Sequence, residues 1–153
     1  MRRSRFWTEG IRDDEGNASL EFVTAGMILL LPLVYLVLTM SAIQAGALAI
    51  EGAARQAARV YVQAPDAAEA KASALRAVAF GLADYGLDGD DAEVTITCAP
   101  EPGECLTRRG FVTVQIAVRI PLPLVPPALT MDVPLAVPLE ATATQQVSRF
   151  WGS

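Results

Sequence analysis

A run of 29 residues without a formal charge lies between Glu21 and Glu51, and no other stretch limits the possible folds of this chain as strongly. As a helix rising ~1.5 Å per residue it would extend for about 44 Å, which exceeds the ~30 Å hydrocarbon core of a bilayer. An ordinary secretory signal has an apolar region of roughly 7 to 15 residues, about half this length. The sequence therefore predicts a membrane helix that persists in the mature protein.

Glu21 stands at the mouth of this run, where a charged side chain costs about 2.5–3.5 kcal/mol even on a lenient insertion scale. One interpretation is a residue that snorkels to the membrane interface. Another follows if the chain is cut after Gly16, because Asn17 then carries a cationic amine. Glu21 lies four residues further on, on the same helix face and roughly 6 Å away. Its carboxylate can then neutralise that amine, or the amine of a neighbouring subunit, inside the bilayer.

The spacing from Gly16 to Glu21, directly before a long apolar helix, resembles the processing site of type IV prepilins. A longer set of segments is similar to TadE-like pseudopilins, the minor pilins of the tight-adherence (Flp-type, type IVb) pilus system. The similarity covers about residues 13–60. It is carried by Gly-Asn-Ala-Ser-Leu-Glu-Phe-Val from Gly16, Leu-Leu-Leu-Pro-Leu around Pro32, and Glu-Gly-Ala-Ala-Arg-Gln-Ala-Ala-Arg from Glu51.

The resemblance implies that a prepilin peptidase of the inner membrane cleaves between Gly16 and Asn17, and that Glu21 guides subunit assembly. It implies other pilin or pseudopilin subunits and the pilus assembly machinery as partners, and a role in cell adhesion. Residues 1–16 would be a cytoplasmic leader, and residues 17–62 the N-terminal helix with a transmembrane part at about 22–46. Residues 63–153 would form an extracytoplasmic domain.

Length, charge and composition narrow the class of protein. Of the 153 residues, roughly 100 remain outside the leader and membrane helix, enough for one small domain. The net charge of −5 comes without a basic cluster, which argues against a nucleic-acid partner. Histidine, the commonest general base and metal ligand, is absent from the sequence. We therefore expect neither an enzyme nor a cofactor.

Arginines set the expected orientation. Four of them precede the apolar run, at positions 2, 3, 5 and 12, while only Arg55 and Arg59 follow closely behind it. Because basic residues favour the cytoplasmic side, the N-terminus should face the cytoplasm. Glu51, Arg55 and Arg59 recur at a spacing of four and should form an exposed, ion-paired strip where the helix leaves the membrane.

Two features of the long helix have alternative interpretations. Pro32 removes a backbone hydrogen bond and favours a kink, although transmembrane helices also tolerate proline without any function. Small side chains repeat every four residues and would let another helix approach closely in a bundle. An alanine-rich composition also produces such rows by chance. The rows contain Ala45, Ala49, Ala53 and Ala57, with Gly46, Ala54 and Ala58 beside them.

A second helix should follow Pro65, since Asp66 and Glu69 form a capping pair and Gly86 ends the segment. We expect one face of it to cover a sheet, through Leu75, Val78, Ala79 and Leu82. The acidic segment from Asp88 to Glu93 lacks the spacing of a calcium loop, so a solvated turn is favoured over a metal site.

Alternating patterns then predict a small antiparallel sheet of about three strands. The first two run through residues 93–98 and 111–120 as a hairpin. Cys98 and Cys105 lie at the hairpin's link, and an extracytoplasmic domain would favour a disulfide between them. Two ligands of a metal site are the alternative, but no third Cys or His completes it.

The remaining chain contains an extended proline-rich connection, Pro121 to Pro127, and an edge strand from Val133 to Ala143. A polar, strand-like tail reaches Phe150, and Phe150-Trp151 either tucks against the domain or marks a contact surface. The expected fold class is thus α+β and pilin-like, anchored by a long N-terminal helix.

Three functional hypotheses remain open. The first is a minor pilin or pseudopilin that acts in assembly of a Tad/Flp-type pilus and is processed after Gly16. The second is a bitopic membrane protein with an extracytoplasmic binding domain and an uncleaved N-terminus. The third is a secreted protein cut near Ala45-Gly-Ala47. The mature N-terminus distinguishes them.

Overall fold

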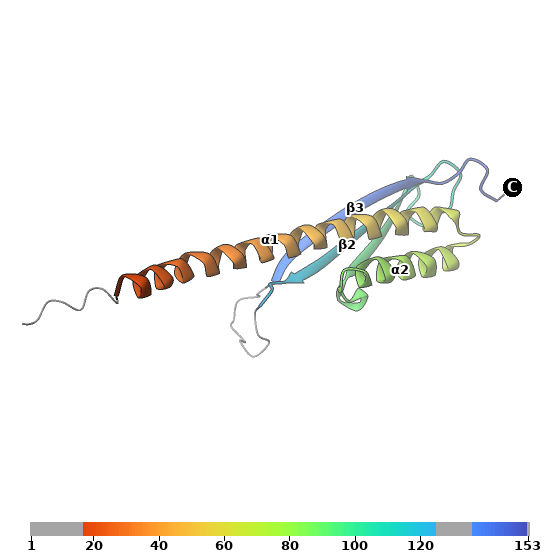
Figure 1. The fold of residues 1–153 in the computed structure, drawn as a ribbon. Helices are drawn as coiled ribbons and strands as arrows, with labels where there is room; N and C mark the ends of the chain where they lie inside the picture. Colours follow the sequence, from red (N-terminus) through yellow and green to blue (C-terminus); the bar gives the residue numbers. More distant parts are fainter. Residues whose placement is uncertain (1–16, 125–135, 153) are drawn as a thin grey trace, which may run out of the picture. The chain divides into compact units, whose positions relative to one another are not determined.

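The protein has an α+β fold, as the sequence predicts, and a computed structural model describes residues 17–124 and 136–152. Helix α1 (Asn17–Gln63) and helix α2 (Ala67–Ala83) precede a 3₁₀ turn, η1 (Gly89–Asp91). Strands β1 (Glu93–Ala99), β2 (Phe111–Pro121) and β3 (Ala136–Gln146) complete the described chain. Figure 1 shows the order of these elements.

Helix α1 belongs to two compact units, one up to Leu38 and one that begins at Thr39. Its first part is apolar and contains Pro32. Its second part is rich in alanine, the residue with the highest intrinsic helix propensity. The expected transmembrane part, about 22–46, therefore overlaps the folded domain by residues 39–46.

Local chemistry at Pro65 explains why α1 ends and α2 begins there. Proline has no backbone N–H, and the Ala64 N–H closes a tight turn onto the Tyr61 carbonyl at 3.3 Å. Asp66 then caps α2, because its Oδ1 accepts a hydrogen bond from the Glu69 backbone N–H at 2.9 Å. The predicted cap at Asp66 is confirmed, whereas the Glu69 carboxylate accepts from Ser73 and Arg76 and not from the Asp66 backbone.

The sheet is antiparallel in the order β1-β2-β3, so β2 is central and β3 is an edge strand, as expected. Every second residue of β2 is buried, from Val112 to Ile120, and the residues between them are half-buried or exposed. The later part of α1 and α2 lie along the sheet in Figure 1. Their buried residues join the inner side of β2 in one core.

The inner side of α2 differs from the expected face. Its buried residues form a single row at a spacing of four, and Leu75 is 42% exposed while Ala79 is exposed as well. The expectation for Leu75 and Ala79 was therefore wrong. Small side chains replace them in the contact because α2 packs closely against α1. The buried row is Ala70, Ala74, Val78 and Leu82.

The C-terminal strand also differs from its expected limits. Pro121, assigned to the proline-rich connection, is the last residue of β2 and pairs with Ala136. Strand β3 extends to Gln146, so part of the polar tail belongs to the sheet. The rest of the expected connection and the start of the edge strand, at residues 125–135, lie outside the described residues.

Candidate functional site

The apolar part of α1 is fully exposed in the isolated chain. Every residue from 19 to 38 is exposed, and Glu21 is the only charged residue in that range. Twenty helical residues rise about 30 Å, the thickness of a bilayer's hydrocarbon core. The helix is thus long and apolar enough to span a membrane once.

The expected cleavage site lies at the very start of α1. Asn17 is its first residue, whereas Gly16 falls outside the described residues. Glu21 follows Asn17 by four residues within the same helix and is exposed. Residues four apart share one face of a helix, so the spacing required for the proposed pairing is retained.

The alanine rows of α1 pack inside the folded domain. Ala49, Ala53 and Ala57 are buried and Ala45 is half-buried. A Cβ atom added to Gly81 of α2 would lie only 3.0 Å from the Cβ atom of Ala53, which shows how closely the two helices approach. Ala49, Ala53 and Ala57 therefore pack inside this chain's own domain, where Ala53 meets α2. Packing of the row with helices of other chains stays a prediction.

Only one ion pair forms among the described contacts of the strip Glu51, Arg55 and Arg59. An Nη2 atom of Arg55 lies 2.7 Å from an Oε2 atom of Glu51, and both side chains are largely exposed. Arg59 is exposed too, but the described residues give it no ion pair. Exposed pairs of this kind contribute about 0–1 kcal/mol, so the strip adds little to stability.

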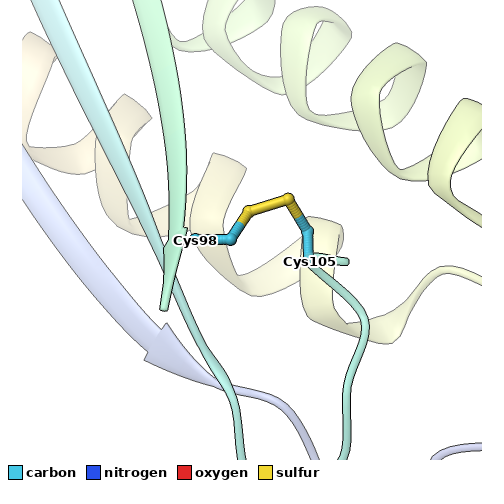
Figure 2. The surroundings of a disulfide bond; sticks show 2 residues. All are labelled: Cys98 and Cys105. Atoms are coloured by element: carbon cyan, nitrogen blue, oxygen red, sulfur yellow. A yellow bond between two sulfur atoms is a disulfide. The ribbon is translucent and has the colours of Figure 1, made fainter. Parts of the chain in front are cut away.

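A disulfide joins the end of β1 to the loop that follows it. The Cα atoms of Cys98 and Cys105 are 5.0 Å apart, and Figure 2 shows the bond between the strand and the returning loop. Cys98 is buried and belongs to the core, and Cys105 packs against it. The predicted bridge is confirmed, and both cysteines are used in it.

The C-terminal tail closes over the same end of the domain. The Trp151 indole Nε1–H donates to the Ala64 carbonyl oxygen at 2.9 Å. The Arg108 Nε–H, from the loop after the disulfide, donates to the Trp151 carbonyl oxygen at 2.9 Å. Trp151 thus tucks against the turn between α1 and α2, while Phe150 stays exposed under the Arg149 guanidinium.

Two pKa shifts accompany these contacts. Hydrogen bonds from Ser73 and then Arg76 lower the pKa of the Glu69 carboxyl group, since both donors favour its charged form. Burial raises the pKa of the Tyr61 phenol, because the anion loses its hydration there. Both groups lie in the folded domain, at the junction of the two helices.

Two open depressions flank Phe80. The first, about 460 Å³, lies between α1 and α2 and is lined by residues that include Gly52, Arg76 and Asp84. The second is lined by the last turns of α2 and by residues 86–89 after it. In the lining of the first depression, the Ser73 hydroxyl donates to the Glu69 carboxylate at 2.9 Å.

The first carboxylate of the acidic segment 88–93 forms a hydrogen bond within the segment itself. Asp88 Oδ1 accepts a hydrogen bond from the Asp90 backbone N–H at 3.0 Å and thereby caps η1. Across residues 17–124 and 136–152, no group of three or more Cys, Asp or Glu side chains is arranged to hold a metal ion.

Comparison with known proteins finds no matching family model, no matching curated protein and no matching solved structure. What the chain does must therefore be inferred from its own residues. Sequence patterns did not reveal the Trp151 to Ala64 contact, which joins residues 87 positions apart, nor the close approach at Gly81.

Proposed function

We propose that this protein is a minor pilin or pseudopilin that acts in assembly of a Tad/Flp-type pilus, and that a prepilin peptidase processes it after Gly16. The observation that carries the proposal is Glu21, the single charge on an otherwise apolar, fully exposed stretch of α1. A carboxylate in that position is costly, which makes Glu21 a functional-site hypothesis by default.

Cleavage after Gly16 would supply the missing partner. The new amine of Asn17 is a cation that enters the bilayer together with the helix. A carboxylate one turn away can neutralise it, either within one chain or between two neighbouring chains in an assembly. Pairing between chains would fix the axial register of one helix against the next, since the partners must meet at the same depth.

The fold is compatible with this role. A long N-terminal helix, half in an apolar stretch and half in a domain, is followed by a second helix and three antiparallel strands. The disulfide fits an extracytoplasmic domain, because such bonds persist in oxidising compartments. Together with the arginine bias these features favour an N-terminus in the cytoplasm and a domain outside the inner membrane.

The mature N-terminus is the first test. Protein extracted from membranes of a host with an active prepilin peptidase should begin at Asn17 by intact-mass spectrometry. A Gly16→Leu variant should keep Met1, because prepilin processing follows the glycine. An intact Met1 form of the unaltered protein would support a bitopic binding protein with a retained leader, and would overturn the proposal.

The second test concerns Glu21 itself. Glu21→Ala should leave membrane insertion unchanged but reduce recovery of the protein with sheared pili. Glu21→Asp, which keeps the charge, should retain part of that recovery. Glu51→Ala is the matched control, because it removes the next carboxylate along α1 at a surface pair of little energetic value. Equal recovery of the Glu21→Ala and Glu51→Ala variants would contradict the assembly mechanism.

A further inference from the structure

One end of the folded domain has no charged side chain among its described residues. Three segments meet there: residues 39–50 of α1, residues 120–124 at and after the end of β2, and residues 136–139 of β3. A Cβ atom added to Gly46 would lie 2.6 Å from Ile120 Cδ1 and 3.4 Å from Leu139 Cδ1, so the three segments are direct neighbours. We call this surface the uncharged end.

Each of the three elements carries a charged residue where its uncharged segment ends. The first charged residue after each uncharged segment, moving into the domain, is Glu51 on α1, Arg119 on β2 and Glu140 on β3. On β2 and β3 the two boundary residues lie close in register, because Arg119 pairs with Pro138 and Ala117 pairs with Glu140. The boundary therefore crosses β2 and β3 at nearly the same level.

Large apolar side chains are exposed at the uncharged end. Leu124 is 76% exposed, Leu48 is 63% exposed and Met40 is 54% exposed. Leu124 also has a φ of +63°, in the left-handed region that residues with a branched side chain rarely adopt. An exposed leucine in a sparsely populated backbone conformation is a candidate contact residue.

The length of α1 indicates which medium surrounds the uncharged end. Residues 19–38 are long enough to cross the ~30 Å hydrocarbon core, and the charge-free run continues to Ile50. Its total of 29 residues corresponds to about 44 Å, which matches the ~40–45 Å thickness of a bilayer that includes a headgroup layer on each side. A run of this length that spans the bilayer ends in the headgroup layer on the side of the domain, and the uncharged end packs beside that last part of the run.

We propose that the uncharged end is a lipid-contact surface, and that Leu124 is immersed in the interfacial layer of a phospholipid bilayer beside the exit of α1. The surface adds the ends of β2 and β3 to the membrane contact of the spanning helix. It would hold the domain at a fixed height and limit its rotation. The proposal requires that α1 spans a membrane, but it does not require that the protein enters a pilus.

The test places a photoreactive diazirine amino acid at single positions of the full chain. The protein is reconstituted in vesicles of phosphatidylethanolamine and phosphatidylglycerol, irradiated, and analysed for lipid adducts by mass spectrometry. Position 124 is the test site, and position 29 in the apolar stretch reports whether α1 spans. Position 150 is the matched control, because Phe150 is 64% exposed and lies beside Trp151, which binds Ala64 after the end of α1.

Position 124 should form lipid adducts roughly tenfold or more above position 150, since burial of a leucine-sized apolar side chain favours the immersed state by about that factor. Labelling at 29 with equal labelling at 124 and 150 would overturn the lipid contact while the spanning helix stands. Adducts from 124 to a second protein chain would also overturn it, in favour of a contact between subunits. No adducts at 29 would refute the span and the lipid contact together.

Discussion

Removing the disulfide should lower the stability of the domain by about 2.5 kcal/mol. The bridge closes a loop of eight residues from Cys98 to Cys105, and the chain-entropy relation gives that value for such a loop at 25 °C. For a domain of roughly 100 residues each kcal/mol shifts the melting temperature by ~4–8 °C, so the expected decrease is about 10–20 °C. The estimate attributes the whole effect to the unfolded chain.

The assay is thermal unfolding of the full chain in detergent, followed by near-ultraviolet circular dichroism with and without a phosphine reductant. The double variant Cys98→Ala, Cys105→Ala is the control. It should melt near the temperature of the reduced protein and should not respond to the reductant.

A decrease of less than about 4 °C on reduction would refute the reasoning. It would mean that the unfolded chain keeps Cys98 and Cys105 close together without the bridge, so that the bridge removes little entropy from it.

Three further perturbations test the helical layer. Asp66→Ala should cost about 1 kcal/mol in denaturant unfolding, because the Glu69 N–H loses its cap. Ala53→Leu should cost roughly 1–3 kcal/mol of stability, because the larger side chain overpacks the contact with α2. Gly52→Ala, where no atom lies within 4 Å of the new Cβ, should stabilise the domain by up to about 1 kcal/mol. Equal effects of the two substitutions would contradict the assigned helix face. Because the pKa of the Glu69 carboxyl group is lowered in the folded protein, this group stabilises the fold at pH values above its ordinary pKa of 4.5. That stabilisation is lost as the pH falls below this value. Glu69→Gln should therefore flatten the decline of stability with acid, and an unchanged pH profile would refute the assignment.

The strands and helix ends were predictable because their signals are local. Pro65 stops α1, Asp66 caps α2, and strict alternation in residues 111–120 identifies a strand with one buried face. The disulfide was predictable as well, since only two cysteines exist and a hairpin link brings them together. In each case the cause and its effect lie within about ten residues.

The packing could not be predicted in the same way. Leu75 is more apolar than Ala74, and hydropathy alone assigns it to the core. The structure buries Ala74 because the distance between α1 and α2 is set by Gly81 and Ala53, on elements separated in the sequence. The start of the domain at Thr39 was hidden for a related reason: one helix passes through it without a break.

The change in side-chain size along α1 links these findings. From Met27 to Leu38 the helix carries mainly large aliphatic residues, which present a broad apolar surface to lipid or to other helices. From Ala42 to Ala58 alanine and glycine predominate, and the face of this part that packs against α2 and the sheet has no room for larger side chains. Domain stability therefore depends on the second part, and the first part is left for contacts outside the domain. Substitutions of Leu33 or Leu36 by Ala should leave domain melting unchanged, while substitutions that enlarge the second part should not.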